Sequence, residues 1–335
     1  MHPLIRLAVP VVLLLLISSC YVSTQGYHLA RDLVAARRVE AYVTGGTASL
    51  EELQFFRNVE EIRQFGRDRL GLPADNVYTT YVQTDREYLV AVVSAAGELS
   101  FTRKEWWFPF FGRFPYRGYY RPASALRMAR RLERQGWDVF VRPVDAFSTL
   151  GFFRDPLYTY MKHYPLDRLA DLILHEMTHG ALWVKNEGQF NEEFAFFVGR
   201  TGSREFMVQR FGEPSPEIED LDRRREERAT FRQDVLALRS ALEEVFRSDA
   251  DAEEMRRDKA ALISAFQERH QITFTVNNAY VDLFSTYSGD IALFEDLHRA
   301  LGEDLELTIS AVIERVTTRP PGVSPKEAIA LDSTQ

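Results

Sequence analysis

The segment from Leu166 to Val184 constrains this chain most, because it joins an unbroken helical pattern to two histidines four residues apart. Apolar residues recur there at helical spacing, namely Leu169, Leu172, Ile173, Leu182 and Trp183. No proline or glycine precedes Gly180 within the pattern. Residues four apart lie on one face of an α-helix. His175 and His179 can therefore present two imidazoles to one metal ion, and any further ligand must come from another element.

The residues around this pair predict a zinc site. Glu176 lies beside His175, where its carboxylate can reach a water bound to the metal. Catalytic zinc usually takes three protein ligands and one water. After the polar break at residues 185–189, a second helical stretch at residues 190–199 carries Glu192 and Glu193 in its first turn. Either carboxylate is a candidate third ligand, although an acidic residue there also complements the helix dipole.

The pattern His175-Glu176-x-x-His179, followed by Asn191-Glu192-x-Phe-Ala, resembles that of gluzincins such as aminopeptidase-N-like enzymes. This resemblance implies that Glu192 is the third zinc ligand. The spacing between the two motifs is shorter here than in that group. The chain also lacks the Gly-x-Met-x-Asn segment that grips the substrate amino terminus in those enzymes. The choice between aminopeptidase and endopeptidase therefore stays open.

The chain more closely resembles a bacterial family of predicted aminopeptidases, whose members are typically lipoproteins. Besides the zinc segment through Val198, the resemblance rests on Cys20 and the stretch after it, and on residues 116–120, 147–153 and 277–279. It implies a zinc-dependent peptidase with a peptide substrate, in which Glu176 is the general base. The alternatives are a zinc-binding envelope lipoprotein without turnover, which an intact Glu176 argues against, and a structural envelope lipoprotein whose motif is accidental.

A peptidase of this kind also needs a donor for the oxyanion that forms during attack on the peptide carbonyl. In zincins this donor is often a tyrosine or histidine from a later segment. We expect Tyr287 in this role, and further candidates are Tyr280, His163, His270 and His298. Residues 147–151, just before the zinc helix, are a candidate edge strand for pairing with the substrate backbone. The aromatic stretch from Trp106 to Tyr120 is expected to pack on a sheet, with lining of a substrate groove as the alternative.

The first twenty residues predict an exported protein. Arg6 precedes an apolar run from Leu7 to Ile17, which is shorter than the roughly 20 residues needed to cross a bilayer. Ile17-Ser18-Ser19-Cys20 resembles a bacterial lipobox, which implies cleavage after residue 19 and a diacylglycerol on the Cys20 thiol. A plain N-terminal membrane anchor is the alternative. Cys20 is the only cysteine, so an intrachain disulfide is excluded.

The same resemblance implies a place in the cell envelope. Tyr21 stands where aspartate is the usual retention signal, which favours the outer membrane, facing the periplasm. The predicted partners are thus a peptide and a membrane, reached through the lipid at Cys20. The net charge of −8 argues against a nucleic-acid partner, because phosphate binding needs a basic surface.

The patterns along the chain predict an α+β fold that is mostly helical. It combines a zincin-like pair of helices around His175 and His179 with a small sheet of at least three strands, at residues 77–82, 88–93 and 137–141, and a charged helical hairpin at residues 216–247 and 251–270. We expect a signal peptide (1–19), N-terminal helices with the sheet (20–145), a helical zinc peptidase unit (146–318) and a flexible tail (319–335).

Overall fold

The structure, a computed structural model, describes residues 21, 24–75, 77–108, 112–144, 156–286 and 291–330. These residues are mostly helical and carry sheets of three strands or fewer, so the predicted α+β class is confirmed. The chain forms two compact units, each built from three segments. Unit 1 takes 1–35, 87–147 and 228–288, and unit 2 takes 36–86, 148–227 and 289–335. This arrangement differs from the consecutive division expected from the sequence.

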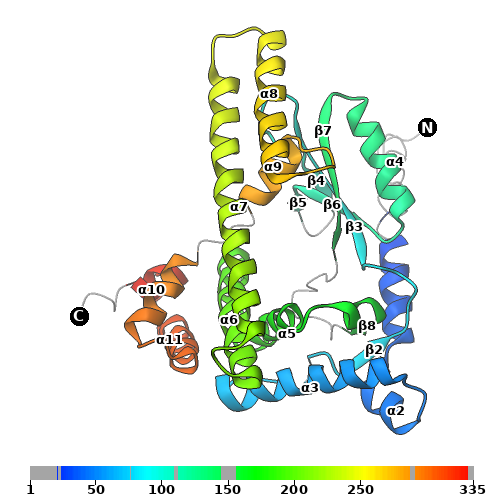
Figure 1. Cartoon of the computed structure of the whole chain (residues 1–335), viewed down its shortest axis with the longest axis vertical. Coiled ribbons are helices and arrows are strands. Elements are labelled where there is room, and N and C mark those ends of the chain that lie inside the picture. The colour runs from blue at the N-terminus through cyan, green and yellow to red at the C-terminus, as the bar shows by residue number, and fades with distance from the viewer. Residues whose placement is uncertain are drawn as a thin grey trace, which may run out of the picture. The chain divides into compact units, whose positions relative to one another are not determined.

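Unit 1 is organised around an antiparallel sheet with β3 (Val90–Gly97) at its centre. The neighbours of β3 are β6 (Tyr116–Tyr119) and β7 (Trp137–Val144). Helices α4 (Pro122–Glu133) and α9 (Asn278–Thr286) lie on opposite sides of the sheet (Figure 1). The strands β4 (Trp106–Phe108) and β5 (Gly112–Phe114) pair separately. Trp106 and Tyr119 pack with the core under α4, so the expected packing of the aromatic stretch is confirmed at these residues.

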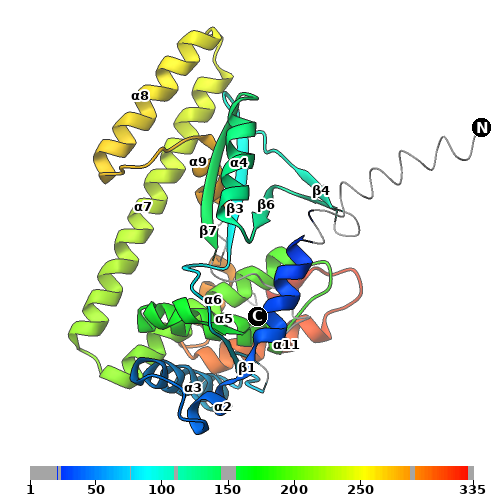
Figure 2. The ribbon, with the colours of Figure 1, turned by 90° about the vertical axis from the view of Figure 1, so that its right-hand side faces the viewer.

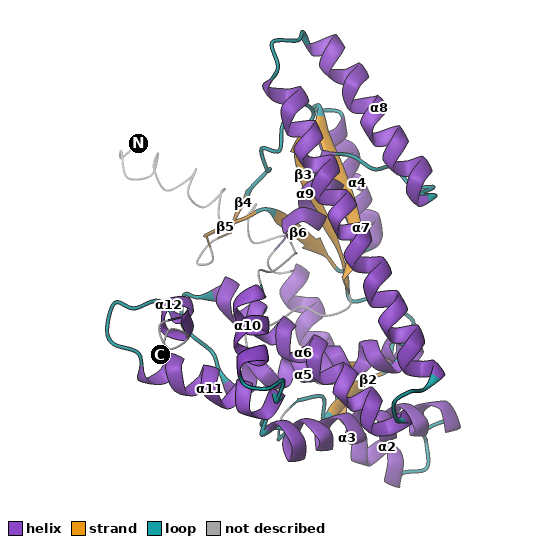
Figure 3. Cartoon of the chain, turned by 60° about the vertical axis from the view of Figure 1, so that its left-hand side comes forward, coloured by secondary structure: helices purple, strands orange, loops and turns teal. Residues whose placement is uncertain are grey.

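The charged helical hairpin is confirmed as α7 (Pro216–Arg247) and α8 (Ala252–His270), which runs back along α7 (Figure 3). Unit 1 contains α7 from Arg228 onward. Asp251 caps α8 by accepting hydrogen bonds from the backbone N–H groups of residues 253 and 254. The two helices bury one apolar stripe between them: Val235, Leu238, Leu242, Ile263 and Phe266.

Unit 2 contains the segment that carries the two histidines. Its helices are α2 (Val39–Thr44), α3 (Leu50–Leu70), α5 (Leu166–Ala181), α6 (Gly188–Phe211), the start of α7, α10 (Ala292–Ala300), α11 (Leu305–Thr318) and α12 (Pro325–Ala330). A 3₁₀ turn spans Thr159–His163. Helix α3 starts at a capping box formed by Ser49 and Glu52 and ends at Gly71 in the left-handed region.

Helix α3 packs against α5 within unit 2. An added Cβ at Gly66 would lie 2.5 Å from Cε of Met177, so only glycine allows this approach without a shift of the methionine. Met177 and Ile173 are fully buried. The apolar pattern that predicted the helix at residues 166–184 is therefore the pattern by which α5 packs into unit 2.

The strand expected at residues 77–82 forms, but it does not join the other two predicted strands. Instead β2 (Thr80–Val82) lies in unit 2, antiparallel to β1 (Arg37–Arg38) and parallel to β8 (Leu157–Tyr158). The reason is Tyr81, which is fully buried among the rings of Tyr42 and Phe56 and donates a hydrogen bond to Glu52 (2.9 Å). The third strand of the unit 1 sheet is β6, from the aromatic stretch.

The expected flexible tail at residues 319–335 is corrected by the structure. Residues 325–330 form α12, in which Ile329 is fully buried and Lys326 reaches Glu193 of α6 at 2.6 Å. The buried side of this short helix consists of Pro325, Ala328 and Ile329. Among the described residues, no helix is long and apolar enough to cross a membrane.

Candidate metal centre

Helices α5 and α6 lie against each other, and their approach is set by small residues (Figure 1). An added Cβ at Gly199 would lie 2.5 Å from a carboxylate oxygen of Asp171 and 2.7 Å from its carbonyl oxygen. One at Gly202 would lie 2.9 Å from Leu174. Because Glu192 precedes Gly199 by seven residues, or two turns, it lies on the same face of α6. The close contact therefore directs Glu192 towards α5.

The turn between the two helices is held by the side chain of Asn191. Its Nδ2 donates to the carbonyl of Val184 (2.8 Å), and its Oδ1 accepts from the N–H of the same residue (2.9 Å). Asn191 is buried, so both bonds are shielded from water. The two bonds tie the start of α6 to the end of α5 and fix the position of the next residue, Glu192.

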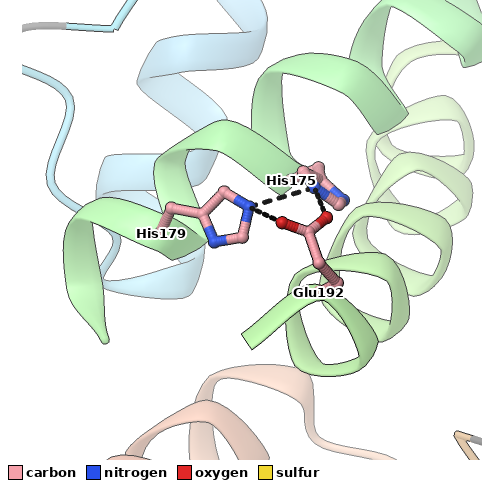
Figure 4. A group of neighbouring side chains, drawn as sticks. All are labelled: His175, His179 and Glu192. Carbon is pink, nitrogen blue, oxygen red and sulfur yellow. Dashed lines mark hydrogen bonds and ion pairs between the residues drawn. The ribbon is translucent and has the colours of Figure 1, made fainter. Parts of the chain in front are cut away.

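The structure brings three ligand atoms together (Figure 4): Nε2 of His175, Nε2 of His179 and the carboxylate of Glu192. The two nitrogens are 3.1 Å apart. The Glu192 oxygens lie 3.4 Å from His175 Nε2 and 3.5 Å from His179 Nε2. Ligands 2.0–2.1 Å from a tetrahedral ion lie about 3.3 Å from one another. The two nitrogens and the Glu192 carboxylate, whose two oxygens each face one histidine, are spaced close to this value, so the group can hold a metal ion.

The three side chains differ in their exposure to solvent. The side chain of His179 is 5% exposed and that of His175 20%, whereas that of Glu192 is 50% exposed. Trp183 packs its ring edge against His179, with centroids 5.4 Å apart. His179 is thus enclosed by protein, whereas Glu192 is the most accessible of the three side chains.

Charge is unevenly divided between the two imidazoles. Burial and the neighbouring charge of His175 lower the pKa of His179 to about 4. Burial also disfavours a charged His175, but the hydrogen bond to Glu192 and the charges of Glu176 and Glu192 outweigh it and raise the pKa of His175. Glu192 can thus hold a proton on His175 while His179 stays neutral. A bound cation would take the place of that proton.

Glu176 lies beside this group without belonging to it. Burial raises the pKa of Glu176, the Glu192 carboxylate adds to the rise, and His175 opposes it. Among the described residues, no hydrogen bond or ion pair holds its carboxylate. A partly buried carboxylate with a raised pKa and no fixed partner is suited to accept a proton.

Glu193, the other candidate ligand, faces away from the histidines. It is buried, accepts a hydrogen bond from Gln189 (2.8 Å) and pairs with Lys326 of α12 (2.6 Å). Adjacent residues of a helix point about 100° apart. With Glu192 turned to α5, Glu193 therefore lies in the interior of unit 2, where its charge is met by the lysine.

None of the expected oxyanion donors that the structure describes is joined to the metal group by a hydrogen bond or ion pair. Tyr280 belongs to unit 1, where its ring packs on Phe140 and Phe284 and burial raises its pKa to about 12. His298 binds Thr308 (2.9 Å), and His270 lies 3.1 Å from Asp234. His163 is exposed beside Glu51. Tyr287, Cys20 and residues 147–151 lie outside the described residues.

The sequence patterns described above do not single out Asp171, Asn191 and Gly199, the residues that position the ligands. Asp171 lies one turn before His175, and burial raises its pKa while the charge of His175 opposes this. The sequence does contain a pattern that indicates this close packing. Ala195, Gly199 and Gly202 follow Glu192 at intervals of three and four residues. A stripe of small residues at helical spacing indicates close helix packing on that face.

The sequence was compared with protein-family models, curated proteins and solved structures. No curated protein and no solved structure matches the chain. One family model, described as "Putative aminopeptidase", matches residues 20–321 and so includes both helices of the metal centre. Since that match covers most of the sequence, the chain belongs to this aminopeptidase family.

Proposed function

We propose that this chain is a zinc-dependent peptidase, and that it releases residues from the amino terminus of peptides as its family description suggests. The observation that carries the proposal is the convergence of His175 Nε2, His179 Nε2 and the Glu192 carboxylate within 4.8 Å of one another. Two imidazoles and one carboxylate are ligands that zinc takes at catalytic sites. Magnesium and calcium prefer sites made mainly of oxygen ligands, whereas two of the three ligands here are imidazole nitrogens.

Bound zinc would lower the pKa of a coordinated water towards 7, so that hydroxide is available at neutral pH. The residues of the chain do the rest. Glu176 accepts the proton at its carboxylate as water attacks the peptide carbonyl, and then delivers it to the leaving nitrogen. Asn191 and Gly199 hold Glu192 in place. The exposed side of Glu192 leaves room for a substrate.

The test separates catalysis from metal binding. Glu176→Gln keeps the side-chain size and the helix propensity but cannot accept the proton. We expect zinc content to stay at that of the parent, while hydrolysis of a mixed peptide library falls by at least about 10²–10⁴-fold. Cleavage sites read by mass spectrometry distinguish amino-terminal trimming from internal cuts. Unchanged hydrolysis by Glu176→Gln would remove Glu176 from the mechanism. A parent that binds zinc but cleaves nothing would be a binding protein.

We also propose that the mature protein begins at Cys20 and is held on the outer membrane by a lipid on that residue, facing the periplasm. Support comes from the lipobox-like sequence at residues 17–20 and from the family match, which starts at residue 20. Cys20→Ser should block acylation, so that the protein takes up no labelled fatty acid and keeps the mass of the uncut chain. Processing and labelling like those of the parent would refute the lipid anchor.

A further inference from the structure

Helix α4 of unit 1 carries a strongly basic outer face. This helix lies against the sheet (Figure 2). Its buried residues are Ala125, Ala129 and Leu132. At 100° per residue, four arginines fall within about 100° of one another on the opposite face of the helix. They are Arg127, Arg130, Arg131 and Arg134, and all four are exposed. We call this set the arginine face.

These arginines have no carboxylate partner among the described residues. Arg127 donates to Ser124 (2.8 Å), and none of the four forms an ion pair. Residues 121–134 hold five arginines against Glu133 alone, in a chain whose net charge is −8. Like charges four residues apart, as at 127 and 131 or at 130 and 134, destabilise a helix. A position at the helix C-terminus offsets part of this cost.

The charged helix α7 shows a different arrangement in the same chain. There Arg223 is paired with Glu227 at 2.7 Å, Arg239 with Glu243 at 3.1 Å and Arg247 with Glu243 at 3.1 Å. These three arginines of α7 are thus balanced by glutamates one turn away, although Arg228 of the same helix forms no ion pair among the described residues. On α4, four such arginines share one face, and this concentration of positive charge indicates that the arginine face meets its negative charge outside the chain.

The start of the mature chain lies on the same side of the sheet as α4. The ring of Tyr21 packs against the buried cluster beneath α4, which includes Tyr119, Ala125 and Ala129. Its hydroxyl donates to the carbonyl of Gly118, and the Arg117 guanidinium lies 3.8 Å from the ring centroid. Tyr21, the residue that follows Cys20 directly in the sequence, thus lies on the side of the sheet that α4 covers.

We propose that the arginine face of α4 binds the anionic phospholipid surface of the membrane that holds Cys20, so that unit 1 docks in one orientation. The inference rests on the membrane attachment proposed above. An acyl anchor and a basic patch are two independent contributions to membrane binding, and an anchor on the residue next to Tyr21 in the sequence would let both act at once. Exposed Leu126, on the flank of the arginine face, adds an apolar contact at the headgroup level.

The experiment compares two kinds of vesicle that the lipid anchor can enter equally well, so that only the contribution of the arginine face differs between them. The full-length lipoprotein, diluted from detergent, is divided between equal amounts of phosphatidylcholine vesicles and vesicles that also contain phosphatidylglycerol, which are then separated by density. The anchor enters both alike. We expect the parent to favour the anionic vesicles by roughly 10²–10³-fold, and less at high salt. The variant Arg127→Gln, Arg130→Gln, Arg131→Gln, Arg134→Gln should divide evenly while keeping its zinc content and peptide hydrolysis.

A matched variant controls for net charge. Arg37, Arg38, Arg228 and Arg257 are also exposed and form no ion pair among the described residues, so their replacement by glutamine removes the same charge elsewhere. This variant should keep most of the preference. The proposal is overturned if the parent divides evenly, if both variants lose the preference equally, or if the parent ignores the vesicles and binds soluble heparin instead. The mass of the N-terminal peptide reports acylation separately, so loss of the anchor and loss of the arginine face are told apart.

Discussion

Gly199 lies so close to Asp171 that a side chain at residue 199 would meet both the carboxylate and the backbone carbonyl of Asp171, at 2.5 and 2.7 Å. We therefore expect Gly199→Ala to force α6 away from α5, with a net cost of about 1–3 kcal/mol in the free energy of unfolding. Because Glu192 is carried on the same face of α6, zinc affinity should fall as well. Chemical denaturation and zinc titration measure the two effects.

Gly188→Ala is the control for this prediction, because nothing lies within 4 Å of a Cβ at that position. Alanine is a better helix former than glycine, so this change should be neutral or slightly stabilising. Equal stability of the two alanine variants would mean that the contact with Asp171 does not restrict the helix pair.

Glu192 and Glu193 should respond differently to the same substitution. Glu192→Gln replaces the charged carboxylate of the third ligand by a neutral amide. The number of zinc ions bound per chain should therefore fall markedly, together with the rate of peptide hydrolysis. Glu193→Gln should keep the zinc but lose the ion pair with Lys326, and so lower the unfolding midpoint. A chelator should destabilise the parent and Glu193→Gln, because zinc binds only the folded state, and should leave Glu192→Gln almost unaffected. Full zinc content in Glu192→Gln would place the third ligand elsewhere.

Asn191 should affect the metal without touching it. Asn191→Ala leaves the N–H of Val184 without its partner, and the carbonyl of Val184 with only the Glu187 N–H (3.2 Å), at a cost of about 1–3 kcal/mol for a buried group. The start of α6 then loosens, and zinc should bind more weakly even though all three ligands are intact. Asn58→Ala, on the surface of α3, should change neither property measurably. Zinc affinity equal to that of the parent in Asn191→Ala would show that the turn does not position Glu192.

Glu205 of α6 should make stability depend on pH. Burial and the nearby charge of Asp304 raise its pKa to about 7, against the opposing charge of Arg69. A carboxyl whose folded pKa lies above its unfolded value stabilises the fold below the unfolded value, and this contribution is lost as pH rises through about 7. The free energy of unfolding should thus decline more from pH 5 to pH 8 in the parent than in Glu205→Gln. Glu226→Gln, an exposed site on α7, should follow the parent, and identical slopes for all three would contradict the prediction.

The local patterns in the sequence determined most of the helices. The apolar spacing in residues 166–184 and 216–247 is repeated within a single helix, and the signals at Ser49, Gly71 and Asp251 act on their own neighbours. The same locality explains why the pairing of His175 with His179 could be predicted, since one turn of helix places both rings on one side. The metal group needs no distant residue for its first two ligands.

The tertiary structure alone decided which distant segments meet. A strand pattern at residues 77–82 says that a strand forms, but its neighbours depend on where Tyr81 finds a buried place, and that place is beside α3 in the second unit. Glu192 and Glu193 are equally good ligands by chemistry and differ by only 100° around α6. The contact of Gly199 with Asp171 and the hydrogen bonds of Asn191 to Val184 set that rotation, because close packing of two helices leaves one face of α6 turned to the histidines.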